Sequence, residues 1–157
     1  MLAEDRAAEV LESFKAVLER RPPSVHDIEG FALTTRVVLP AALLAHDRSV
    51  LALWIDDETV VAGGALHQAA IDHSRAIAAL LDGNREAADA SFARAAATYF
   101  ERGWLLLGHE LAWQWSRTGS RAASKALDAA ITFYEGQGAN WRLRWLAEQR
   151  HAEVGEG

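Results

Sequence analysis

The chain has 157 residues, half of them hydrophobic, which suits a single domain with a buried core. Its formal net charge of −6 argues against a nucleic-acid-binding surface, because neutralising phosphates requires clustered basic residues. The chain has no cysteine, so disulfides, thiolate catalysis and cysteine-ligated zinc sites are excluded.

Composition also indicates the kind of secondary structure and the location of the protein. Alanine and leucine dominate the apolar residues and proline occurs only three times, which favours helix over sheet. The first 21 residues mix acidic with apolar side chains and therefore lack the continuous apolar core of a signal peptide. Later apolar runs are too short or too interrupted to span a bilayer. We expect a cytoplasmic protein, or an excised cytoplasmic domain.

Residues 1–58 predict irregular N-terminal helices. An apolar stripe over residues 2–19 predicts a first helix, which the two prolines that follow should end. A second helical segment starts at Ser24, and Pro40 should kink or split it because proline removes an internal hydrogen bond. Residues 49–58 suit either a buried strand or a short helix, and we choose the helix because an isolated hairpin is marginally stable.

Residues 59–153 predict regular helices that breakers and capping residues separate. We place these helices at residues 59–81, 85–102, 104–117, 121–135 and 140–151. A glycine follows each of the first four, as expected where a helix closes in the left-handed conformation. Asn84 and Asn140 are placed to cap the helices that they precede. The expected fold class is therefore all-α, with seven or eight helices.

Two of these helices carry the same pattern of small and large residues, 35 positions apart. The pattern consists of Ala88, Phe92 and Ala95 in the first copy and of Ala123, Leu127 and Ala130 in the second. Tyr99 and Tyr134 keep the same offset, as do Gly103 and Gly138. The spacing is close to the 34 residues of a tetratricopeptide unit, whose second helix carries an A-x3-F signature.

The intervening helix opens with a second tetratricopeptide-like pattern. Trp104, Leu107, Gly108 and Leu111 follow the W-x2-L-G-x2-Y order, with leucine in the last place. Small residues allow paired helices to approach closely, while larger ones fill the space between them. We therefore expect one domain, residues 1–157, in which residues 59–153 form antiparallel helix pairs stacked as a short right-handed solenoid.

Three segments carry a more particular resemblance, which covers most of the chain. They are His26-Asp27-x-Glu29-Gly30-Phe31, the stretch from Leu80 to Ala95 around Asp82-Gly83-Asn84, and Phe133-Tyr134-x3-Gly138-Ala139. These segments resemble the C-terminal helical-repeat region of large actinobacterial cyclase-like or LuxR-type ATPase regulators. The resemblance implies a regulatory module for protein interaction or signal sensing. The P-loop sequence of such ATPases does not occur in the chain.

The repeat register predicts which side chains face a binding groove. Arg102, His109 and Trp113 fall on the concave face of the helix that begins at Trp104, and Arg75 falls on the same face of an earlier helix. A cation, an imidazole and an indole together suit an acidic or aromatic peptide, because arginine binds carboxylates bidentately and indole buries a large area. The alternative is that Trp113 packs against the next unit and Arg75 is solvated.

The remaining conspicuous residues have structural interpretations. Trp141 and Trp145 lie one turn apart, so we interpret them as a stripe that docks the last helix, and Trp115 as core. His67 and His73 diverge around a helix, which makes a shared metal ion improbable. No nucleophile is evident, because no G-x-S-x-G turn surrounds the serines of the predicted helix interiors, which are Ser74, Ser91, Ser116 and Ser124.

These observations favour a non-catalytic regulatory scaffold that binds a protein or peptide, without cofactor or metal. One alternative is a self-associating domain, because alanine-rich end helices tend to stack on a second copy. Another is a small-ligand sensor, or an all-helical enzyme, with a pocket at the kink around Pro40.

Overall fold

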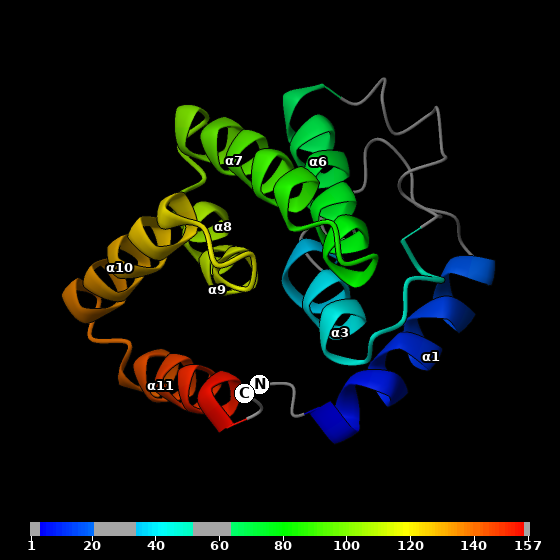
Figure 1. Ribbon diagram of the computed structural model, residues 1–157. Coiled ribbons are helices and arrows are strands. Elements are labelled where there is room, and N and C mark those ends of the chain that lie inside the picture. The colour runs from blue at the N-terminus through cyan, green and yellow to red at the C-terminus, as the bar shows by residue number, and fades with distance from the viewer. Residues whose placement is uncertain (1–3, 21–33, 52–63, 156–157) are drawn as a thin grey trace.

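The computed structural model describes residues 4–20, 34–51 and 64–155, and within these ranges every regular element is a helix (Figure 1). The elements, in chain order, are α1 (Glu4–Arg20), the π-helix η1 (Thr34–Val38), α3 (Leu39–Leu44), α6 (Ala65–Leu81), α7 (Arg85–Glu101), α8 (Leu105–Glu110), α9 (Ala112–Ser116), α10 (Arg121–Gly136) and α11 (Asn140–Gly155). The predicted all-α class is confirmed for this part of the chain. The predicted short helix at 49–58 lies largely outside the described residues, and residues 49–51 form a turn. The prediction that one helix runs from residue 59 to residue 81 is wrong at its start, because Gly64 has a φ of 84° and the helix begins only at Ala65.

The helix changes type next to Pro40, where the sequence predicts a kink or a split. η1 runs directly into α3 through Val38, whose φ of −72° and ψ of −46° are helical, so the helical path is not divided there. Pro40 lies in the first turn of α3 and has no N–H to donate, and the π-helical turn of η1 directly precedes this helix. Every residue of α3 is buried, so this short helix is a central part of the core.

The two helices with the repeated pattern bury the same pattern positions. All six residues of the A-x3-F/L-x2-A pattern are buried, and so are Tyr99 and Tyr134. Gly103 and Gly138 both take positive φ, 75° and 65°, which side-chain-bearing residues rarely adopt. The small residue Gly108 also acts as predicted, because a Cβ atom there would meet the ring of Phe100 at 2.7 Å. The burial of the pattern residues and the close approach at Gly108 are therefore confirmed.

The helices pack mainly on their neighbours in the chain. α6 and α7 form a helical hairpin in which Arg94 reaches Asp72 across the interface at 3.1 Å. α3 packs between α1 and α6, while α10 contacts α8, α9 and α11 (Figure 1). The path curves back far enough that side chains of α1 and α11 line one pocket.

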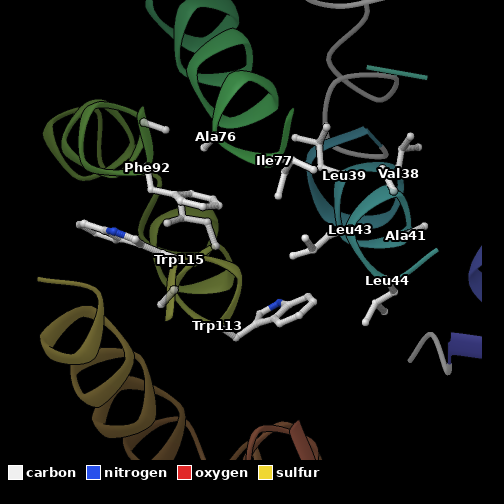
Figure 2. Close-up of a cluster of buried hydrophobic side chains, with 14 of the residues drawn as sticks. Val38, Leu39, Ala41, Leu43, Leu44, Ala76, Ile77, Phe92, Trp113 and Trp115 are labelled. Carbon is white, nitrogen blue, oxygen red and sulfur yellow. The ribbon is translucent and has the colours of Figure 1, made fainter. Parts of the chain in front are cut away.

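One predicted helix is interrupted. Residues 104–117 form two helices, α8 and α9. Leu111 between them has a ψ of −15°, which is less negative than the value of about −42° in a regular α-helix. Figure 2 shows the result on α9: Trp115 lies beside Phe92, while Trp113 lies on the side of Leu43 and Leu44 in α3. The ring centroids of Phe92 and Trp115 are 6.4 Å apart, and Trp115 is buried as predicted.

Candidate functional site

The four predicted contact residues lie in different environments. Arg75 is exposed on α6, and Arg102 is exposed at the end of α7. His109 is half-buried in α8, and Trp113 is buried in α9. The two arginines are therefore accessible to a partner, whereas His109 is half-buried and Trp113 is buried.

His109 lies between two aromatic side chains. Its ring stacks on Phe133 with centroids 4.3 Å apart, and Phe100 meets it edge-on at 5.1 Å. Burial lowers the pKa of the His109 imidazole, which favours the neutral ring. The side chain thus joins α7, α8 and α10.

The prediction that Trp113 faces outward is wrong. Only 3% of the residue is exposed, because Trp145 of α11 packs edge-on against the indole at 4.8 Å. The alternative interpretation, packing against the next unit, is the one observed. The predicted docking stripe of α11 is correct only at Trp145, since Trp141 is 58% exposed.

The groove predicted to combine the four residues lacks the indole, because Trp113 is buried. α6 packs chiefly on α7 and α3, and α8 packs on α7 and α10, so Arg75 and His109 lie on two helices that both contact α7. Burial of Trp113 removes the indole from any surface shared with Arg75. Two other features of the described residues have the shape of binding sites.

The first feature, here called the α8 hollow, lies between α8 and α10. Its lining residues are Gly103, Trp104, Leu105, Leu106, Leu107, Phe133 and Gln137, and its volume is about 420 Å³. Leu105 is 49% exposed and Leu106 is 41% exposed, although both are large apolar side chains. Arg102, one of the predicted contacts, directly precedes Gly103 in the lining. Most of the lining is apolar.

The second feature, here called the Pro40 pocket, lies at the predicted kink. It has a volume of about 330 Å³ and is lined by Arg6, Val10, Arg36, Val37, Pro40, Leu44, Trp113, Arg142 and Trp145. These residues come from α1, η1, α3, α9 and α11. The repeat register singled out only Trp113 among them, since the three arginines are brought together by the curvature of the chain.

Two of the pocket's arginines are held in place by neighbours. Arg36 donates to both carboxylate oxygens of Glu110, at 2.7 and 3.0 Å, and this contact raises the pKa of its guanidinium. The guanidinium carbon of Arg142 lies 4.4 Å from the centroid of the Trp145 ring, a cation-π contact. Both guanidinium groups are therefore oriented before any ligand binds.

A buried polar cluster elsewhere has a structural role. His73 Nε2 and Gln114 Oε1 are 2.9 Å apart in the interface between α6 and α9. Burial lowers the pKa of His73 to about 4, so the imidazole is neutral at pH 7. Across the described ranges, no three metal-ligating side chains gather into a candidate metal site. The same ranges hold no helix with the length and apolar character needed to cross a membrane.

Comparison of the chain with protein-family models, with curated proteins and with solved structures found no match.

Proposed function

We propose that this protein is a non-catalytic regulatory scaffold that binds a protein or peptide partner through the α8 hollow. The proposal includes the tetratricopeptide-like solenoid of antiparallel helix pairs that the 35-residue repeat predicts. The observation that carries it is the exposure of Leu105 and Leu106 beside the partly buried Phe133. Adjacent exposed apolar side chains on a small domain are typical of an interaction surface.

The hollow also has a rigid support. Phe133 is fixed by the stacked His109, and Gly108 brings α8 against the ring of Phe100. A preorganised surface loses less conformational entropy on binding than a flexible one. The partner that fits is a segment with apolar or aromatic side chains, and an acidic residue in it would lie near Arg102.

The resemblance to the repeat region of actinobacterial regulators supports the same proposal. In such proteins a helical-repeat module is understood as a protein-interaction or signal-sensing unit. Regulation follows from that resemblance, and the cytoplasmic location follows from the composition of the chain; both are part of the proposal.

Selection of peptides from a random phage library, with the folded protein as bait, tests the proposal. We expect enriched peptides rich in apolar residues that bind wild type and lose at least about tenfold in affinity to a Leu105→Ser, Leu106→Ser variant. The matched control is Ala129→Ser, an exposed change on α10 outside the lining. Equal binding to both variants, or selection of no peptides, would show that the hollow is not the binding surface.

Self-association is a second candidate, because the same exposed leucines in two copies would cover each other. Light scattering over a dilution series measures it directly. A stable dimer that the double serine variant converts to monomer would identify the α8 hollow as a self-association surface. A monomer at all concentrations would leave the hollow to a different partner.

A further inference from the structure

We propose that the Pro40 pocket is a binding site for a small amphipathic organic anion, with a carboxylate head and an aliphatic body. This site is separate from the α8 hollow and goes beyond the proposed function. Its volume of about 330 Å³ is at the lower end of the range for small-molecule pockets, which begins at about 300 Å³.

Charge identifies the head of the ligand. Three arginines converge on one pocket in a chain whose formal net charge is −6, so the local sign is opposite to the overall one. Arg142 Nε is buried and has no hydrogen-bond acceptor among the described residues. Among the same residues, Arg6 forms no ion pair. Arg36 has its carboxylate partner in Glu110. One further carboxylate would satisfy donors that the fold leaves without an acceptor.

The pocket walls identify the body of the ligand. Between the arginines lie Val10, Val37, Pro40 and Leu44, together with the indoles of Trp113 and Trp145. A bare inorganic anion would leave this apolar surface in contact with water. A ligand with an aliphatic segment next to its carboxylate covers both kinds of surface.

An adjoining groove offers space for the aliphatic body of the ligand. A second hollow of about 320 Å³ shares Arg6, Val10 and Val37 with the Pro40 pocket and continues along α1 and η1. Its remaining lining residues are Glu9, Ser13, Phe14 and Val38. The three shared residues join an arginine-rich end to a largely apolar end, which is the arrangement that a carboxylate with an aliphatic chain requires.

Decanoate, below its micelle concentration, is a suitable probe, with decanol and acetate as comparisons. Because Trp113 and Trp145 line the pocket, tryptophan fluorescence reports binding, and calorimetry gives the affinity. We expect saturable one-site binding of decanoate, and binding of decanol and acetate at least about tenfold weaker because each lacks one half of the recognised chemistry. Absence of decanoate binding, or equal binding of decanol, would overturn the proposal.

Single substitutions locate the site. Arg142→Gln and Arg6→Gln should each weaken decanoate binding by about tenfold, whereas Arg144→Gln should leave it unchanged. Arg144 is the matched control because it is exposed on the same helix and outside the lining. Arg6 is itself exposed, so its variant should keep the wild-type circular dichroism spectrum even if Arg142→Gln does not. If the folded Arg6→Gln and Arg144→Gln variants bind equally well, the proposed head site is wrong.

These outcomes are independent of the peptide experiment. The Leu105→Ser, Leu106→Ser variant should bind decanoate like wild type, since neither leucine lines the Pro40 pocket. Loss of peptide binding without loss of decanoate binding would separate the two sites. Loss of both in that variant would contradict their separation.

Discussion

At the scale of single residues, Trp113 and Trp141 have the same side chain and opposite environments. Their exposed fractions are 3% and 58%. Local pattern assigned the first to a surface and the second to the core, and both assignments are wrong. The exposure of an indole on a helix depends on which other helix covers it, and the covering residue for Trp113, Trp145, lies 32 positions further along the chain.

This difference predicts the effect of removing each indole. Trp113→Ala should lower the free energy of unfolding by about 3–5 kcal/mol, because it leaves a cavity beside Trp145. Trp141→Ala should lower it by less than about 1 kcal/mol, as for most exposed positions. Urea denaturation of both variants measures these values. Similar losses for the two variants would contradict the buried position of Trp113.

His73 predicts a pH dependence of stability. Its folded-state pKa is about 4 against an ordinary 6.5, so the unfolded chain takes up the proton first as the pH falls. The free energy of unfolding should therefore fall by up to about 3 kcal/mol between pH 6.5 and 4, and stay level above this window. Burial lowers the pKa of His109 as well, which adds a loss of the same sign.

Urea denaturation at pH 7 and at pH 4.5 measures the effect. His73→Gln should show a smaller fall in stability than wild type, whereas His46→Asn, a change at an exposed turn residue, should keep the wild-type fall. An unchanged pH dependence in His73→Gln would show that this imidazole is not the group that titrates.

At the scale of elements, local signals located most helix ends, although α6 begins at Ala65 and not at residue 59. Asn84 caps α7 as predicted, with its side chain accepting from the Ala87 N–H at 3.1 Å. The break at Leu111 was missed, because nothing in the apolar pattern of residues 104–117 interrupts a helix. The local sequence pattern also does not predict side-chain contacts between elements, and the contacts of Asp89 are the clearest example.

Asp89 ties α7 to the turn between α9 and α10. Its Oδ1 accepts hydrogen bonds from Trp115 Nε1 at 2.6 Å, from Thr118 Oγ1 at 3.3 Å and from Ser120 Oγ. Ser120 in turn caps α10 by accepting from the Ala123 N–H at 3.0 Å. One carboxylate thus fixes the start of the second repeated helix against the first.

Asp89→Ala should lower the free energy of unfolding by about 2–3 kcal/mol, because it leaves buried donors without an acceptor. Asp89→Asn keeps an acceptor oxygen and should lose less. Ala90→Ser, an exposed change at the next position, should cost about 0.5 kcal/mol from helix propensity alone. Chemical denaturation of the three variants tests this order, and equal values for Asp89→Ala and Ala90→Ser would contradict the role of Asp89.

At the scale of the whole molecule, the core is continuous from α1 to α11. One cluster of buried side chains includes Ala7 and Leu11 near the N-terminus and Trp145 and Leu146 near the C-terminus. The Pro40 pocket lies where the first and last of these helices approach each other. Such a shared core couples the helices more strongly than nearest-neighbour contacts alone would.

We therefore expect a single cooperative unfolding transition. Circular dichroism reports all helices, while tryptophan fluorescence weights α9 and α11, and the two midpoints in urea should coincide. Separate midpoints would indicate that the repeated helices unfold independently of α1 and α3, as in a longer open array.

The sequence by itself determined the all-α class, most helix ends and the buried faces of the two repeated helices. These depend on local propensity, capping and the 3.6-residue period, which act over a few turns of chain. Tertiary structure decided which aromatic rings are covered and which arginines meet. Arg6, Arg36 and Arg142 share a pocket only because the helix path curves back on itself, and that curvature results from packing between residues far apart in the chain.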